Sequence, residues 1–342
     1  MSEPMAGTAA VKADRADDHE PSRNEKAART KTRGEYADLV RRQGVYVALV
    51  VLIIFNLIFT DNIASERVLL LQLTQVTPVL IVPLGMALVI GTEGIDLSVG
   101  AVMALGAAVF PLYLGYGAPA ALGIGLACGV ATGFIAGVLV AHVGVQPIVA
   151  TLGIMVAGRG LANLVGGEIK TIRDPDIIAL GTAGLGKLPY TVLIAFVLAV
   201  IVAFVVRKTT YGRQLVAVGG NKPAAALAGI PVRRVLIVTY IICGLLAAVA
   251  GVLLAARSQA SDPTKLGLLM ELSAITAVVI GGTPLSGGQV RILGTVAGAL
   301  LMQLINATLI FHDIADSTAQ MVQAAIVVGA VYVQIGRRKG AS

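Results

Sequence analysis

Four charged side chains stand within or beside apolar runs long enough to cross a membrane. Glu93 and Asp96 lie in the segment GTEGIDLSVG, Arg159 lies inside an apolar run, and Glu271 begins another. A charge at membrane depth costs roughly 2.5–3.5 kcal/mol on insertion scales, so each group should face a partner or water. These groups could line a substrate path. Alternatively, Arg159 could pair with Glu271 or Asp96 and hold broken helices together. We favour the ion pair and keep both interpretations open.

Two serines extend this polar set. Ser98 follows Asp96 closely, and both residues can cap the start of the next helix. Ser286 can cap a helix in the same way or hydrogen-bond between helices. The candidate pathway or intramembrane polar residues are therefore Glu93, Asp96, Ser98, Arg159, Glu271 and Ser286.

The sequence contains no convincing catalytic or metal site. The segment 181–187, GTAGLGK, has the spacing of a phosphate-binding loop, but Leu188 replaces the Ser or Thr that would hold magnesium and Pro189 follows it. The histidines are far apart and match no metal-ligand spacing: they are His19, His142 and His312. We therefore expect no catalytic residue, no metal and no bound cofactor, and we expect that the chain does not hydrolyse ATP itself.

A polar segment at 207–234 separates two apolar runs and predicts a small helix of its own. The segment holds six Lys and Arg residues and no acidic residue. Asn221 can cap the helix start, the alanine-rich run 224–228 can extend it, and Gly229 followed by Pro231 can end it. A membrane protein with a capped helix on its cytoplasmic face is expected to present that helix to a partner, which places the motor on another chain.

The composition predicts an all-α, polytopic transmembrane bundle. Hydrophobic residues make up 56% of the 342 residues, and charged residues only 13%. Apolar runs of helix-spanning length indicate about ten spans: 45–60, 71–91, 97–115, 119–142, 147–166, 189–206, 235–256, 269–284, 292–311 and 319–336. The transmembrane domain is expected at 43–336, between a disordered tail at 1–42 and a short tail at 337–342.

The distribution of positive charge predicts the orientation in the membrane. With the N-terminus in the cytoplasm, 17 Lys and Arg residues flank the spans on that side and six lie on the other. This asymmetry follows the positive-inside rule and explains the net charge of +7 without nucleic acid. An even number of spans returns the C-terminus to the cytoplasm as well.

Glycine spacing and aromatic content give two further expectations. Gly125, Gly129, Gly133 and Gly137 recur at every fourth residue and predict a helix face that another helix approaches closely. The chain has no Trp, and aromatic residues make up only 4% of it. Because sugars usually stack on aromatic rings, a tight sugar site within these helices is not expected, and recognition of a polar cargo would come from another subunit.

Four blocks of the sequence resemble the inner-membrane permease subunits of bacterial ABC importers for monosaccharides, of the ribose, xylose and galactose type. They are GIDLSVGAVMAL at 94–105, ATLGIMVAGRGLA at 150–162, TYGRQLVAVGGNKPAAALAGI at 210–230 and ELSAITAVVIGGTPLSGG at 271–288. The resemblance covers about residues 45–336. Pro223 and Pro284 depart from the pattern, at places where related permeases more often carry Glu and Ser.

The resemblance implies a homodimeric permease of the bacterial inner membrane. Such a permease works with a cytoplasmic ATPase subunit, which uses ATP and Mg²⁺, and with a periplasmic sugar-binding protein. The residues that would couple the ATPase to the membrane map onto Gly212, Arg213, Asn221, Ala224, Ala225, Gly229 and Ile230.

Other functions remain open at this point. The chain could be a permease of the same superfamily for branched-chain amino acids or another small solute. It could also be a self-sufficient secondary transporter or channel with Glu93, Asp96 or Glu271 as ion sites, or a membrane scaffold that transports nothing. The sequence does not identify the solute.

Overall fold

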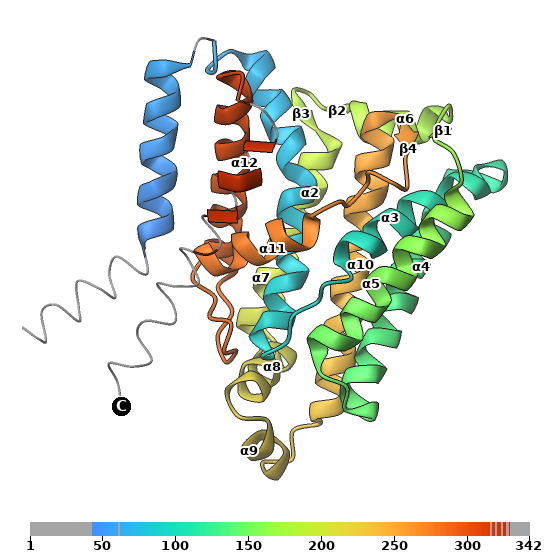
Figure 1. Ribbon diagram of the computed structural model, residues 1–342, viewed down its shortest axis with the longest axis vertical. Coiled ribbons are helices and arrows are strands. Elements are labelled where there is room, and N and C mark those ends of the chain that lie inside the picture. The colour runs from blue at the N-terminus through green and yellow to red at the C-terminus, as the bar shows by residue number, and fades with distance from the viewer. Residues whose placement is uncertain are drawn as a thin grey trace, which may run out of the picture. The chain divides into compact units, whose positions relative to one another are not determined.

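The computed structural model describes residues 43–60, 62–314, 317–318, 320–322, 324–325 and 328. The predicted tails at 1–42 and 337–342 lie outside these residues, as does most of the predicted span at 319–336. The described part of the chain is almost entirely helical, and the predicted all-α fold is confirmed (Figure 1).

Seven of the described helices are long and apolar enough to cross a membrane. They are α2 (Glu66–Gly91), α3 with the turn η1 (Val99–Val109 and Phe110–Tyr116), α4 with the turn η2 (Ala118–Val138 and Leu139–Val143), α5 (Pro147–Gly166), α7 (Tyr190–Lys208), α10 (Val232–Ser258) and α12 (Ile292–Phe311). The helix Gln43–Phe59 is apolar but slightly shorter.

The segment predicted as a span at 269–284 forms a much shorter helix, α11 (Met270–Ile280), of 11 residues. At 1.5 Å per residue this helix is roughly 16 Å long, about half of the 30 Å that the hydrocarbon core requires. The stretch from Gly281 to Arg291 is not helical. Composition alone could not show this, because the apolar run of α11 continues into the small residues 281–284 without a charged residue.

The remaining elements lie at the two ends of the bundle. At one end are α6 (Pro175–Thr182) and two antiparallel strand pairs, β1 (Lys170–Thr171) with β4 (Ala260–Ser261) and β2 (Gly184–Leu185) with β3 (Leu188–Pro189). Figure 1 shows α8 (Thr210–Gly220) and α9 (Lys222–Leu227) at the opposite end.

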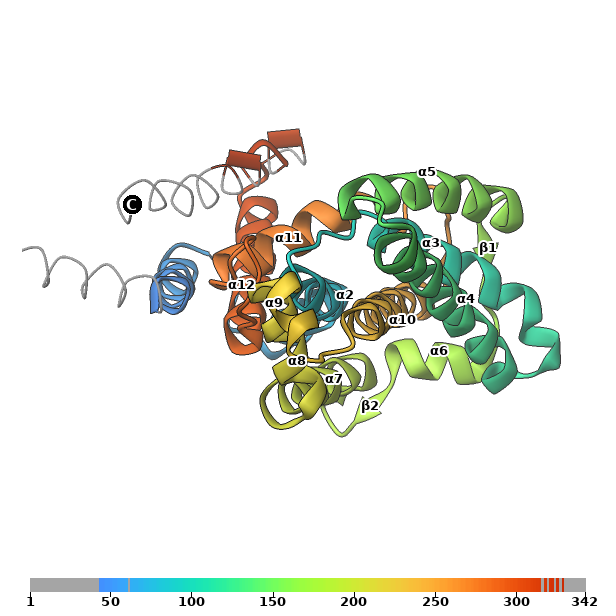
Figure 2. The same ribbon diagram turned by 90° about the horizontal axis from the view of Figure 1, so that it is seen from below.

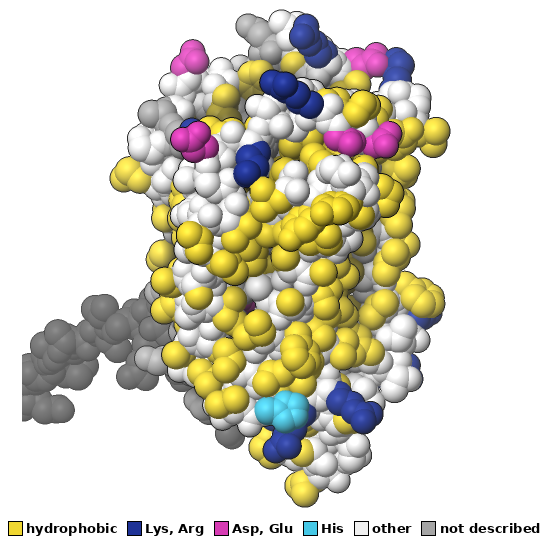
Figure 3. All heavy atoms as spheres, turned by 90° about the vertical axis from the view of Figure 1, so that its right-hand side faces the viewer, with side chains coloured by type: hydrophobic (Ala, Val, Ile, Leu, Met, Phe, Trp, Pro, Cys, Tyr) yellow, Lys and Arg dark blue, Asp and Glu magenta, His cyan; other side chains and the backbone are white. Residues whose placement is uncertain are grey.

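Helices α2 and α10 form the interior of the bundle (Figure 2). The most apolar stretch of α2 is 78% buried and that of α10 is 67% buried, whereas those of α5 and α7 are 22% and 17% buried. Figure 3 shows the face that carries α4 and α5: a broad apolar band with charged side chains gathered at its two ends. An exposed apolar band between charged ends is the surface expected for contact with lipid.

The glycine series in α4 packs as predicted. All four glycines are buried, and a methyl group on Gly129 or Gly133 would overlap main-chain atoms of α10. At Gly137 the nearest atom of α10, the Cα of Ile237, would lie 2.7 Å from such a methyl group. The glycines therefore let α4 and α10 approach backbone to backbone.

Helix α3 begins inside the bundle rather than at its edge. After α2 ends at Gly91, residues 92–98 run back toward the interior without helical structure, and every residue of α3 is buried. This non-helical stretch carries Glu93, Asp96 and Ser98. Non-helical backbone at membrane depth is tolerated only where protein covers it, and here the bundle does so.

Candidate functional site: the exposed segment α8–α9 and the interior polar residues

The small helix predicted in the polar segment is present with the predicted start and end. The side chain of Asn221 accepts a hydrogen bond from the Ala224 N–H at 2.9 Å and caps α9. At the other end Gly229 has a φ of +77°, and the Ile230 N–H donates to the Ala225 carbonyl at 3.0 Å. This left-handed end and the following Pro231 stop the helix.

A second helix, α8, precedes α9 and was not predicted. The Thr209 side chain caps it by accepting from the Gly212 N–H at 3.3 Å. A methyl group on Gly212 would overlap the Val206 carbonyl oxygen, so glycine permits the tight connection between α7 and α8. Arg213 is exposed and donates to the Thr210 hydroxyl at 3.1 Å.

Helix α8 is fixed to the bundle through a buried hydroxyl pair. The Tyr211 hydroxyl lies 2.8 Å from the Thr239 hydroxyl of α10. Burial raises the pKa of Tyr211 to about 12, so this phenol stays neutral at physiological pH. The hydroxyl pair therefore ties the polar segment to the central helix.

The faces of α9 differ sharply in exposure. Ala225 is 5% exposed and packs against the core, and Ile230 is partly buried beside it. Ala224 and Gly229 are exposed, and Leu227 is 92% exposed. Sequence reasoning missed Leu227, although it is the one large apolar side chain in an alanine-rich run. Of the predicted coupling residues, Ala225 anchors the helix, while Ala224 and Gly229 border its free surface.

Asp96 is buried and makes local hydrogen bonds. One carboxylate oxygen accepts from the Ser98 N–H at 2.9 Å and from the Ser98 hydroxyl at 2.6 Å. The Ser98 side chain makes no cap hydrogen bond to α3, so its predicted capping role is not seen. Instead, Asp96 orders the turn that leads into α3.

Arg159 bridges two segments, but its partners differ from the predicted ones. Its guanidinium donates to the carbonyl oxygens of Leu266 at 2.7 Å and Gly267 at 3.2 Å. Within the described part of the chain it forms no close ion pair with Glu271 or Asp96, although the charges of Arg159 and Glu271 interact electrostatically. Arg159 holds α5 against the loop before α11 through hydrogen bonds to main-chain oxygens. The predicted connection between segments is therefore present, but main-chain carbonyls replace the predicted carboxylate partner.

Glu271 lies beside the start of α3. A methyl group on Gly100 would overlap one of its carboxylate oxygens, and that buried oxygen has no hydrogen-bond partner among the described residues. Glu93 and Ser286 lie elsewhere: both are exposed, and the Glu93 carboxylate is 3.7 Å from the Lys222 ammonium. The structure thus divides the polar set, leaving Asp96, Ser98, Arg159 and Glu271 in the interior.

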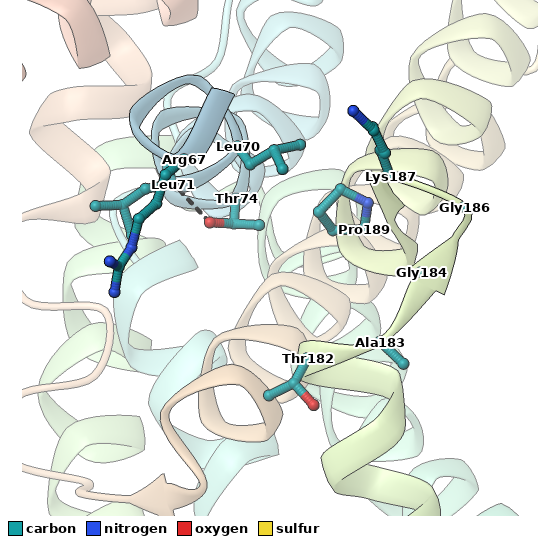
Figure 4. A pocket seen from close by; sticks show the side chains of 10 residues that line it. All are labelled: Arg67, Leu70, Leu71, Thr74, Thr182, Ala183, Gly184, Gly186, Lys187 and Pro189. Atoms are coloured by element: carbon teal, nitrogen blue, oxygen red, sulfur yellow. Dashed lines mark hydrogen bonds between the residues drawn. The ribbon is translucent and has the colours of Figure 1, made fainter. Parts of the chain in front are cut away.

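A cavity of about 460 Å³ opens at the end of the bundle opposite α9, between the start of α2 and the β2–β3 hairpin (Figure 4). Its lining includes Arg67, Leu70 and Thr74 of α2 and Gly186 and Lys187 of the hairpin region. The Lys187 ammonium lies 2.8 Å from the Glu66 carboxylate. The glycine-rich stretch rejected as a phosphate loop therefore forms a hairpin, and its lysine is held by an acidic side chain.

The loop before α11 carries an ordered acidic turn. The Asp262 carboxylate accepts from the Thr264 hydroxyl at 2.6 Å and the Thr264 N–H at 3.0 Å. These hydrogen bonds lower the pKa of Asp262, a residue that is partly buried. The turn orders the loop whose main-chain carbonyls accept hydrogen bonds from Arg159.

Comparison with known proteins identifies relatives over most of the chain. Residues 68–331 match the family described as "Branched-chain amino acid transport system / permease component". The galactofuranose transporter permease protein YtfT of Escherichia coli is 41% identical over 268 residues, which are 78% of this chain and 79% of that protein.

Two further relatives cover more of the chain. The ribose import permease protein RbsC of Escherichia coli is 37% identical over 84% of this chain and 91% of its own length. The L-arabinose ABC transporter permease protein AraH of Azospirillum brasilense is 31% identical over 93% and 94%. No solved structure matches the chain.

Proposed function

Because the chain belongs to the branched-chain amino acid transport system permease component family, we propose that it is the membrane subunit of an ATP-driven importer for a monosaccharide. The named relatives support a sugar over an amino acid, since they are permeases for galactofuranose, ribose and arabinose. The chain is a transport subunit, not an enzyme. In our proposal it lies in the bacterial inner membrane and forms the translocation pathway.

The observation that carries this proposal is the exposed helix α9. An apolar side chain that is 92% exposed on a capped helix, fixed to the bundle on its other face, is suited to fill a groove of a partner. We therefore propose that α9 contacts a cytoplasmic ATPase subunit. That subunit binds ATP and Mg²⁺, and this chain binds no cofactor. A second copy of the chain and a periplasmic sugar-binding protein complete the importer.

The interior polar residues support a structural role over an ion site. Asp96 accepts hydrogen bonds from Ser98 and Cys243, and Arg159 donates to main-chain carbonyls. A path without aromatic stacking platforms would pass a sugar with low affinity, and the binding protein would select it. The unpaired carboxylate oxygen of Glu271 is buried against the start of α3 and so does not face an open path.

Leu227→Asp tests the docking role of α9. Loss of a central apolar contact at an interface costs about 2 kcal/mol or more, which is roughly a 30-fold weaker affinity. We expect Leu227→Asp to reduce copurification with the ATPase and ATP-dependent uptake by at least tenfold. Leu185→Asp is the matched control, because Leu185 is 70% exposed at the opposite end. Wild-type copurification of Leu227→Asp would contradict the assignment.

The cargo is tested on the periplasmic binding protein that copurifies with the importer. A thermal-shift screen should show stabilisation by one of ribose, galactofuranose or arabinose, and none by leucine. Stabilisation by leucine alone would favour a branched-chain amino acid permease. Uptake driven by a proton or sodium gradient in liposomes that contain only this chain would contradict the importer and favour a secondary transporter.

A further inference from the structure

Three glycines from three separate segments meet at the base of α8. Gly219 is the penultimate residue of α8, Gly91 is the last residue of α2, and Gly288 lies between α11 and α12. The Gly288 N–H donates to the Gly91 carbonyl at 3.0 Å. A methyl group on Gly219 would overlap that same carbonyl oxygen and lie 2.7 Å from the Gly288 nitrogen. We refer to these three residues as the glycine junction.

The surroundings of the glycine junction hold the three segments in fixed register. Leu215 of α8 is fully buried, and it and Val290 occupy the space where a side chain at Gly91 would lie. Gly288 has a φ of +75°, which other residues rarely adopt. Beside the junction, the Lys222 ammonium at the start of α9 lies 3.7 Å from the Glu93 carboxylate.

The glycine junction connects the exposed helix to both interior loops. From Gly91 the chain runs through 92–98 to Asp96 and the start of α3. From Gly288 it runs back through 281–287 to the end of α11 at Ile280; Glu271 and the carbonyls that accept from Arg159 lie at the opposite end of that helix. Because main chain touches main chain without intervening side chains, a displacement on one side has no flexible group to absorb it.

We propose that the glycine junction is the route by which movement of α9 reaches the loops before α3 and after α11, with Gly219 as its central positioning residue. This inference rests on the proposed function, because it requires a partner that moves α9. Beyond the proposed function, it identifies the two loops to which the movement of α9 is transmitted. Gly220 is excluded from the route, because a side chain there would meet open space.

The pair Gly219→Ala and Gly220→Ala tests the proposal in proteoliposomes that contain the permease, its ATPase and the binding protein. Both changes add one methyl group, and the two glycines are the last two residues of α8. We expect Gly219→Ala to retain copurification with the ATPase and ATP hydrolysis, while uptake of the sugar found in the thermal-shift screen falls at least tenfold. Gly220→Ala should match the wild type. Equal uptake by the two variants would overturn the proposal.

A charge exchange provides a second test that does not depend on core packing. Lys222 and Glu93 are both partly exposed, so their variants should fold. We expect Lys222→Glu and Glu93→Lys each to lower uptake about two- to fivefold, as for a partly exposed ion pair, and the double variant to restore it. If the Gly219→Ala protein does not accumulate in the membrane, the charge exchange decides. The proposal is then overturned if the double variant Lys222→Glu/Glu93→Lys does not restore uptake. Absence of ATP-dependent uptake by the wild type would instead contradict the proposed function.

Discussion

Asp96 shows how a buried acidic side chain can serve the fold rather than transport. Two hydrogen bonds from Ser98 end on the same carboxylate oxygen, and the Cys243 thiol of α10 also hydrogen-bonds the carboxylate. An asparagine in this position keeps an oxygen that can accept them, whereas an alanine does not. Replacing Asp96 by asparagine or by alanine therefore distinguishes a structural role in the turn from a role as an ion site.

We expect Asp96→Asn to retain at least half of wild-type uptake and Asp96→Ala to lose most of it, together with thermal stability in detergent. The alanine variant leaves the Ser98 N–H and hydroxyl unpaired in a buried position, which costs about 1–3 kcal/mol for each group. ATP-dependent uptake and the unfolding temperature of the purified protein measure the two effects. An inactive but stable Asp96→Asn would show that the charge itself is needed, as a proton or cation site requires.

At the scale of elements, the contact between α4 and α10 depends on glycine at particular turns of one helix. Gly133 would overlap the Tyr240 carbonyl oxygen if it carried a methyl group, while Gly123 of the same helix faces open space. We expect Gly133→Ala to lower stability by about 1–3 kcal/mol through overpacking, and Gly123→Ala to leave it unchanged or raised by up to about 1 kcal/mol. Thermal unfolding in one detergent compares them. A Gly123→Ala variant as unstable as Gly133→Ala would remove the packing explanation.

Elements with a local signal could be predicted, and those defined by contacts could not. The long apolar helices, the glycine face of α4 and the Asn221 cap each follow from neighbouring residue types. Helix α11 could not be told from a full span, because its apolar run continues into the loop that follows. The partners of Arg159 are main-chain carbonyls, which no residue type reveals. Leu227 became recognisable only once its exposure was known.

At the scale of the whole molecule, the orientation in the membrane is the property on which the proposed function most depends. The end of the bundle with α8 and α9 must face the ATPase, and the end with the β2–β3 hairpin must face the binding protein. Leu227 and Leu185 mark these ends and are 92% and 70% exposed. Single cysteines at the two positions report orientation, once the native thiols of Cys128 and Cys243 have been replaced.

We expect Leu227→Cys to react with a membrane-impermeant maleimide only in inside-out vesicles, and Leu185→Cys only in intact spheroplasts. The replaced background Cys128→Ala/Cys243→Ala must first show wild-type uptake, because Cys243 is buried in the core. Labelling of both positions from one side would contradict the arrangement of the bundle. The reversed pattern would leave the fold intact but place α9 outside the cell, away from ATP. The orientation predicted from the distribution of Lys and Arg residues would then be wrong.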